Sequence, residues 1–241
     1  MTHRLRVTYR KQGAARYVAH LDLMRTWERA IRRAHLPLTY SQGFTPHPKL
    51  QLAAPLPVGT ASEGELIDVW LDEPVTPEEM RTRLSRQLPG GLEIVNVTLV
   101  DDRAPSLQAA SIAAHYEVRY HADEIDEAAL CADLARFLAL EALPWEEARG
   151  DRVRAFDLRA AVLEASVRRE GDQLVLAARL SLRGGGSARP SSLARALGLG
   201  EVEPLITTRV SLELGEPGAV DGDLESDTGD TSGDELEAER A

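Results

Sequence analysis

The side chains of this chain that are best suited to binding chemistry lie in the segment SQGFTPHPK, between Ser41 and Lys49. Phe44, His47 and Lys49 supply an aromatic ring, an imidazole and an ammonium group with no acidic residue among them. This combination suits a surface that stacks bases and holds phosphates. The alternative is a loop inserted into a sheet, in which Phe44 caps the core and the prolines prevent edge pairing.

The same segment contains residues that stiffen its backbone. Gly43 permits a positive φ angle, whereas Pro46 and Pro48 hold an extended path. Pro48 also keeps the residue before it out of the helical region. We therefore expect a rigid loop that presents the candidate ligand-binding residues Gln42, Phe44, His47 and Lys49.

A second candidate site begins a predicted helix in the segment HLDLMRTWERAIRRA, residues 20–34. Asp22 complements the positive end of the helix, and His20 either caps the helix or approaches a phosphate. Basic side chains occupy the faces of this helix away from its apolar stripe. The basic candidates for RNA contact are Arg25, Arg29, Arg32 and Arg33.

The segment SEGE at residues 62–65, which is followed by Asp68, predicts an acidic hairpin turn. Glu65 would then pair with Arg29 or Lys49, or orient a histidine. Two carboxylates near a histidine can perform acid–base catalysis, but a polar turn is the simpler interpretation. No pair of nucleophile and base is evident, so we name no catalytic residue.

The segment RGGGSARP, residues 183–190, predicts a flexible basic loop before a helix. Arg183 and Arg189, together with backbone N–H groups, could contact an RNA backbone. The segment lacks the Gly-Lys-Ser/Thr of a phosphate-binding Walker loop, and a plain connection is the alternative. The histidines lack ligand-like spacing, so we expect neither a metal nor a cofactor.

Composition restricts the class of protein. The chain has 241 residues, of which 43% are hydrophobic, so it can bury a sizeable core. Its single cysteine, Cys131, excludes an internal disulfide, a cysteine-based zinc site and an iron–sulfur cluster held by this chain. No apolar run approaches the roughly 20 residues of a membrane helix. We therefore expect a cytoplasmic protein without a membrane partner.

Charge is distributed unevenly around the net value of −11. Residues 1–50 contain ten Lys and Arg, two acidic residues and four histidines, whereas residues 216–241 contain ten acidic residues and one arginine. A basic region of this kind indicates either a polyanionic partner or a solvated helix face. The acidic segment has no periodic apolar residues, and we expect it to be disordered.

The predicted elements alternate between strands and helices in a repeated order. Residues 1–102 read strand, helix, strand, strand, helix, strand, which is the ferredoxin-like order. In the first helix, Leu21, Met24, Trp27, Ile31 and Ala34 form the apolar stripe. The second helix begins at Thr76 as N-cap, with Pro77 after it.

After a linker at residues 103–113, the order restarts in residues 114–215. Residues 115–121 predict a strand, 127–142 a helix, and 153–167 with 173–182 a hairpin. A short helix after Pro190 and a strand at 206–214 complete the unit. We therefore predict an α+β protein of two tandem ferredoxin-like (βαββαβ) units with an acidic tail.

Residues 17–71 resemble the DUF2344 family, also called radical-SAM-linked or radical-SAM-associated proteins. The matching pieces, in order, are HLDLMR, ERAIRRA, LPLTYSQGFTPHPKL, APLPVG and SEGELID. Ala19 departs from the pattern, since the family usually has serine there. The resemblance implies a radical-SAM protein encoded nearby as partner, and it does not assign a biochemical activity to the chain itself. With no C-x3-C-x2-C triad, this chain is at most an accessory.

Three functional hypotheses follow. In the first, a basic cleft formed by the first helix, residues 41–49 and residues 183–189 binds tRNA or rRNA and helps a radical-SAM enzyme to modify it. In the second, the same surface is a protein–protein adaptor that docks on that enzyme without nucleic acid. In the third, the chain is a metal-independent ribonuclease with His20 or His47 as its acid–base group.

Overall fold

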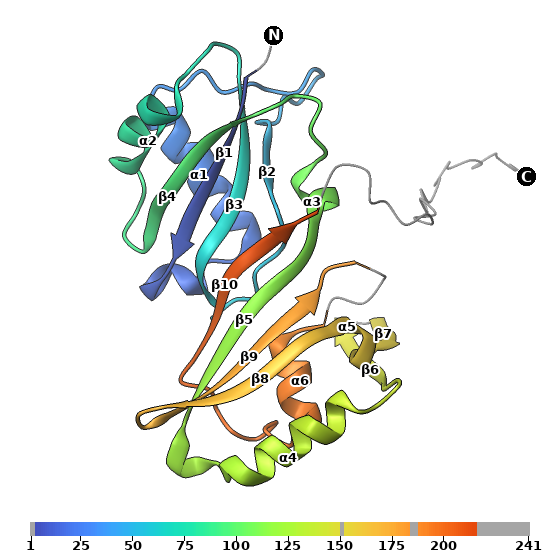
Figure 1. Cartoon of the computed structure of the whole chain (residues 1–241). Helices are drawn as coiled ribbons and strands as arrows, with labels where there is room; N and C mark the ends of the chain where they lie inside the picture. The colour runs from blue at the N-terminus through green and yellow to red at the C-terminus, as the bar shows by residue number, and fades with distance from the viewer. Residues whose placement is uncertain (1–2, 150–151, 184–187, 216–241) are drawn as a thin grey trace, which may run out of the picture.

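The computed structural model describes residues 3–149, 152–183 and 188–215 (Figure 1). The predicted acidic tail and the glycines of the 183–190 segment lie outside these residues. The elements of the N-terminal half are β1 (His3–Lys11), η1 (Gly13–Tyr17), α1 (His20–Arg33), β2 (Leu50–Leu52), β3 (Ala61–Leu71), α2 (Pro77–Ser85) and β4 (Leu92–Val100).

The C-terminal half contains more elements than the sequence predicts. They are α3 (Leu107–Ala110), β5 (Ser111–His121), η2 (Ala122–Glu124), α4 (Glu127–Leu138), β6 (Pro144–Arg149), β7 (Arg152–Asp157), α5 (Leu158–Ala161), β8 (Val162–Glu170), β9 (Gln173–Ser181), α6 (Pro190–Ala196) and β10 (Ile206–Leu214). The expected strand at 153–167 is wrong, because α5 interrupts it and β7 pairs with β6 instead. The expected hairpin turn at Gly171 is confirmed by the pairing of β8 with β9.

The mixed α+β class is confirmed. One large sheet runs through the described residues in the order β4-β1-β3-β10-β5-β9-β8, and β2 pairs with β3 beside this path. Neighbouring strands are antiparallel except β3 and β10, which are parallel. Figure 1 shows the two halves stacked along this sheet, with α1 and α2 beside the upper half and α4 and α6 beside the lower half.

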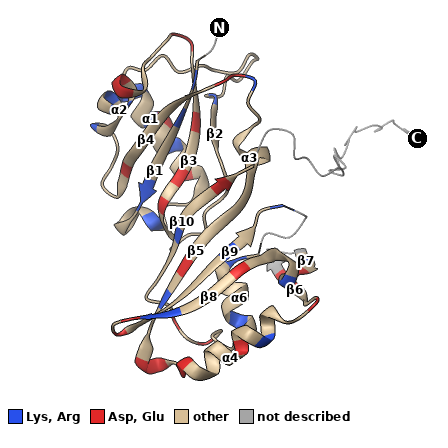
Figure 2. Ribbon diagram, viewed as in Figure 1, with Lys and Arg blue, Asp and Glu red and all other residues tan. Residues whose placement is uncertain are grey.

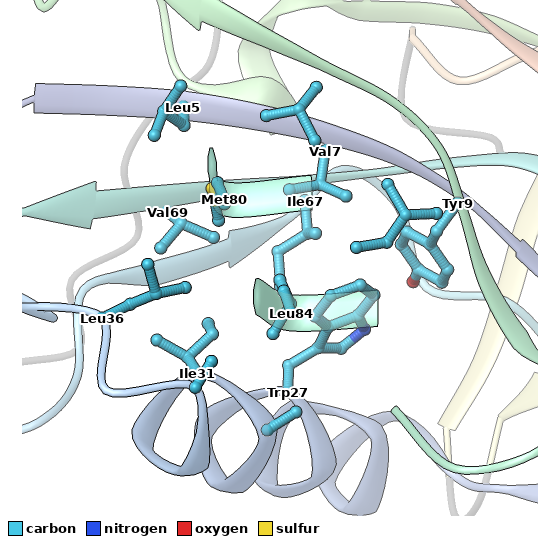
Figure 3. Close-up of a cluster of buried hydrophobic side chains, with 14 of the residues drawn as sticks. Leu5, Val7, Tyr9, Trp27, Ile31, Leu36, Ile67, Val69, Met80 and Leu84 are labelled. Atoms are coloured by element: carbon cyan, nitrogen blue, oxygen red, sulfur yellow. The ribbon is translucent and has the colours of Figure 1, made fainter. Parts of the chain in front are cut away.

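The core of the N-terminal half forms where α1 packs against β1 and β3 (Figure 3). Trp27 is fully buried, and its ring meets that of Tyr9 edge-on at a centroid distance of 4.8 Å. The predicted stripe needs one correction, because Leu21 is 68% exposed and Leu23 is buried in its place. The buried stripe follows Leu23, Trp27 and Ile31 at steps of four, and Leu21 faces outward because two residues turn it by about 200° from Leu23.

The predicted start of α2 is confirmed. Thr76 is the N-cap, and its side chain accepts a hydrogen bond from the N–H of Glu79 at 3.1 Å. Pro77 follows at the first helical position, where a missing N–H costs nothing. Across the described residues, no helix has both the length and the apolar character to cross a membrane.

The two halves meet where β3 lies beside β10. Ala61 pairs with Thr208 and Ser62 with Arg209, and the Ser62 hydroxyl donates to the Arg209 carbonyl at 2.8 Å. Gly64 suits this contact, since a Cβ there would lie 3.1 Å from the backbone oxygen of Val210, closer than an ordinary van der Waals contact. The SEGE segment is therefore part of a strand, and its prediction as a hairpin turn is wrong.

Candidate nucleic-acid interface

The outer surface of α1 carries the predicted arginines. Arg25 is 3.1 Å from Asp22, and Arg32 is 3.7 Å from Glu28. Both pairs are solvent-exposed, and ion pairs of this kind contribute little to stability. These guanidinium groups are therefore available to a ligand that offers a better acceptor.

The two remaining arginines of α1 differ in their partners. Arg33 donates from Nη2 to the carbonyl of Gln87 at 2.9 Å, which ties α1 to the end of α2. Arg29 is exposed and has no hydrogen bond or ion pair within the part of the chain that the structure describes. The middle of the helix thus presents an uncompensated positive charge to solvent.

Residues 41–47 form a small closed loop beyond the C-terminal end of α1. The N–H of Ser41 donates to the His47 carbonyl at 2.8 Å, and the His47 N–H donates to the Ser41 hydroxyl at 2.9 Å. Gly43 has the positive φ angle that the sequence predicts, at 137°. These bonds close the loop at its base and hold its tip away from the core.

The tip of this loop is the most exposed aromatic position described. Phe44 is fully exposed, so the alternative in which it caps the core is wrong. Gln42, His47 and Lys49 are also exposed, whereas Pro48 is half-buried and forms an isolated antiparallel β-bridge with Tyr40. The loop therefore presents aromatic, imidazole and ammonium groups to solvent.

His20 and Asp22 do not cap α1. The N-cap is Ala19, which makes no side-chain hydrogen bond to the helix. His20 is the first residue of the helix and is half-buried, and Asp22 pairs with Arg25. His47 is not on this helix, which ends at Arg33, but in the loop that it closes with Ser41.

The third predicted segment lies in the other half of the molecule. Arg189 is the N-cap residue of α6, and its Nε is 3.9 Å from Glu147. Arg183 follows β9, and residues 184–187 between the two arginines lie outside the described part of the chain. Figure 1 shows α6 in the lower half and α1 in the upper half, so α1 and this segment do not form one wall.

Acidic residues gather at one end of the molecule. Figure 2 shows basic and acidic residues in both halves, with acidic residues concentrated at the start of α4 at the bottom of the view. The acidic residues there are Asp123, Glu124, Asp126 and Glu127. A polyanion would therefore be repelled from this end of the C-terminal half.

Glu65 does not pair with Arg29 or Lys49. It is buried in β3 and forms a two-pronged ion pair with Arg209 of β10, with one N–O distance of 2.7 Å. The Arg209 guanidinium also donates to the carbonyl of Ala54 at 2.9 Å and to that of Pro55 at 3.4 Å. The proline-rich loop before β3 thus supplies acceptors to the buried arginine.

This buried cluster perturbs the ionisation of its members. Burial opposes the charge of Arg209, but the Glu65 carboxylate outweighs it and raises the pKa of that guanidinium above its usual value. Burial lowers the pKa of Lys11, and it raises the pKa of Tyr9, with the charge of Glu65 acting in the same direction on Tyr9. Because Glu65 and Arg209 come from different halves, the cluster joins the halves.

Asp68, the second carboxylate considered in the sequence analysis, is also part of a buried ion-pair cluster. It is fully buried and accepts hydrogen bonds from Arg4 at 2.8 Å and from Arg6 at 2.8 Å. Neither Glu65 nor Asp68 contacts a histidine in the described residues. The arrangement that acid–base catalysis by these carboxylates requires is therefore not formed.

The helix-free face of the C-terminal half contains a groove of about 380 Å³ across β10, β5, β9 and β8. Its charged side chains pair with one another: Arg179 binds Glu213 at 2.8 Å, and Arg168 binds Glu117 at 2.6 Å. Tyr116, the one aromatic residue at this groove, is buried and hydrogen-bonds to Arg209 through its hydroxyl. The exposed ring among the described lining residues is the imidazole of His115, which lies 3.6 Å from Glu213.

Two residues of structural interest were missed by the sequence analysis. Arg209 has no local signal, because its partner is 144 residues away. Tyr17 at the end of η1 is 59% exposed, and it had no local signal, because the extended residues Val18 and Ala19 separate it from the periodicity of α1. It adds an exposed aromatic ring next to α1.

Comparison with known proteins gives a family but no activity. A family model described as "Uncharacterized protein conserved in bacteria (DUF2344)" matches residues 4–190. No curated protein matches the chain. Among solved structures, the crystal structure of an unknown protein from Galdieria sulphuraria aligns at 12% identity over 90% of this chain and 100% of that chain, with a TM-score of 0.26.

Proposed function

This chain belongs to the DUF2344 family of uncharacterized bacterial proteins, and we propose that it is a non-catalytic accessory protein that binds RNA through its N-terminal half. The RNA surface consists of the outer face of α1, with Arg25, Arg29 and Arg32, and the loop at residues 41–47. Below, this set is called the α1 surface.

The observations that carry the proposal are available cations on α1 and an exposed ring in the same half of the molecule. Arg29 has no partner among the described residues, and Arg25 and Arg32 have only exposed, weak ones. Phe44 is fully exposed at the tip of a closed loop beyond the same helix. Cations that hold phosphates beside aromatic rings that stack bases are the usual elements of single-strand recognition.

The fold is compatible with this role. We infer that the halves are tandem ferredoxin-like units joined edge to edge. In support, the strands follow the order β4-β1-β3-β2 in one half and β10-β5-β9-β8 in the other, each with two helices in the expected connections. This architecture alone does not indicate function.

We propose a radical-SAM enzyme as the protein partner, on the resemblance of residues 17–71 to radical-SAM-associated proteins. The α1 surface would then hold the RNA while the partner modifies it. The ribonuclease hypothesis has less support, because neither His20 nor His47 forms an ion pair with a carboxylate in the described residues.

Replacing Phe44 with alanine tests the loop. We expect the free energy of unfolding to stay unchanged, because the ring has no contacts to lose, and the binding of RNA to weaken by about 1–3 kcal/mol through lost stacking. Fluorescence anisotropy with a labelled, unstructured RNA measures the affinity. Leu140→Ala, at an exposed apolar position of the C-terminal half, is the control that should bind like the wild type.

The adaptor hypothesis predicts another outcome of the same substitution. An exposed phenylalanine on a stiff loop is also suited to a protein pocket. If Phe44→Ala leaves RNA affinity unchanged but abolishes co-purification with the radical-SAM partner after nuclease treatment, the surface is an adaptor. RNA binding that equals that of the wild type in this variant would remove the loop from the proposal.

A further inference from the structure

The C-terminal residues 216–241 have the composition of a polyanion. They contain ten acidic residues and one arginine, and they follow directly on Gly215, which is the last described residue. A run of carboxylates is attracted to a cationic surface as the phosphates of a nucleic acid are, and guanidinium groups bind both kinds of anion. This segment is therefore a candidate ligand for the arginines to which we assign RNA.

The acidic segment is attached to the N-terminal half of the molecule. The N–H of Gly215 donates to the Ala110 carbonyl at 2.8 Å, and Figure 1 shows β10 ending beside α3. Leu214 packs against a cluster that contains Ala53. Ala53 directly follows β2, and β2 contacts α1. The segment thus begins in the half that carries α1.

The length of the segment is sufficient for a contact with α1. Its 26 residues span at most roughly 90 Å when fully extended, whereas the 14 residues of α1 span about 21 Å. Attachment through a short linker holds two partners at an effective concentration of the order of millimolar. Weak ion pairs between the segment and α1 would therefore be populated in the intact chain.

The arginines of α1 are more available than the cations of the C-terminal half. On β8, Arg168 lies 2.6 Å from Glu117 and Arg169 lies 3.1 Å from Glu127, so these cations already have counter-charges. Arg29 of α1 has no hydrogen bond or ion pair within the described ranges. The acidic start of α4 also repels an anionic segment. Charge therefore favours α1 as the place where the segment binds.

From this charge complementarity and the point of attachment, we infer that residues 216–241 bind the arginines of α1 and compete with RNA for them. The inference rests on the proposed function and adds an intramolecular regulator of the same surface. RNA then binds only after it displaces the segment, so the apparent affinity of the full-length protein is lower than that of the free surface.

The first test neutralises the segment in the full-length protein, with every Asp→Asn and Glu→Gln in residues 216–241. At low salt, this neutral-tail protein should bind an unstructured RNA about threefold to tenfold more tightly than the wild type, the order expected when a few exposed ion pairs no longer have to break. Fluorescence anisotropy measures both affinities, and thermal unfolding shows whether each variant is folded.

The same neutralisation in the triple variant Arg25→Ala, Arg29→Ala, Arg32→Ala distinguishes a contact with α1 from a change in overall charge. If the segment binds these arginines, neutralising it should give little or no gain in this background, because the contact is already lost. An equal gain in both backgrounds, or no gain in the wild-type background, overturns the inference.

A second measurement does not depend on RNA. An unlabelled peptide with the sequence of residues 216–241 is added to ¹⁵N-labelled neutral-tail protein at low salt, up to about 1 mM, the order of the effective concentration in the intact chain. The NMR signals of α1 should shift, and the shifts should be absent when the three arginines are alanine. A peptide that leaves α1 unchanged overturns the inference and not RNA binding. Peptide binding at α1 without any RNA binding by the neutral-tail protein overturns the proposed function and not the contact.

Discussion

Glu65→Ala is expected to lower the free energy of unfolding by about 3–5 kcal/mol, because it leaves a buried guanidinium without its counter-charge. Arg209 is 1% exposed, and its remaining partners are neutral groups, among them the carbonyls of Ala54 and Pro55. Neutral acceptors offset only part of the desolvation of a cation. Urea unfolding followed by circular dichroism measures the loss.

Two further variants distinguish the effect of leaving one charge unpaired from the effect of any substitution at these positions or of losing any ion pair. In the double variant Glu65→Leu with Arg209→Met, both charges are absent, so most of the lost stability should return. Glu164→Ala removes an exposed partner of Arg179 and should change stability by no more than about 0.5 kcal/mol. A cost for Glu65→Ala as small as that for Glu164→Ala would contradict the role of this pair in joining the halves.

The triple variant Arg25→Ala, Arg29→Ala, Arg32→Ala should bind unstructured RNA at least about tenfold more weakly than the wild type, since each guanidinium lost removes a phosphate contact. Stability should change little, because in the described part of the chain these side chains pair with the exposed Asp22 and the half-buried Glu28 of the same helix. Removing Arg33 instead would break its bond to Gln87 and confuse binding with folding. Anisotropy at low salt gives the affinity.

A variant with the same change in net charge provides the control. Arg136, Arg169 and Arg195 are at least half exposed and belong to the C-terminal half. If RNA responds only to overall charge, replacing these three by alanine should weaken binding as much as the α1 variant does. The proposed α1 surface requires that this control retain nearly the affinity of the wild type.

Local sequence patterns correctly predicted elements whose structure depends on residues that are close together in the sequence. The alternation in residues 206–214 gave β10, and the Thr76-Pro77 pair gave the start of α2, as the structure has them. Exposure of Phe44 also agrees with the stiff loop that its flanking residues predicted. The identities of these residues set backbone preferences that the rest of the fold does not override.

Contacts between residues that are far apart in the sequence could not be predicted from local patterns. The SEGE segment has the composition of a turn, but it lies in β3, where the backbone of β10 leaves little room for a side chain at Gly64. Several basic residues nearer in the sequence could have paired with Glu65, but its partner is Arg209 on the last strand, β10. The separation of Arg189 from α1 likewise depends on the pairing of β3 with β10, which joins the two halves. Pairing between the halves leaves no periodic pattern in the sequence of either half.

The salt dependence of RNA binding tests the central claim most directly. For full-length wild type and an unstructured RNA, the logarithm of the association constant should fall linearly with the logarithm of salt concentration, and the triple arginine variant should have a slope shallower by about two units, at about 0.7 per phosphate contact. A flat dependence for the wild type, or equal slopes for the two proteins, would mean that the arginines of α1 do not hold an RNA backbone.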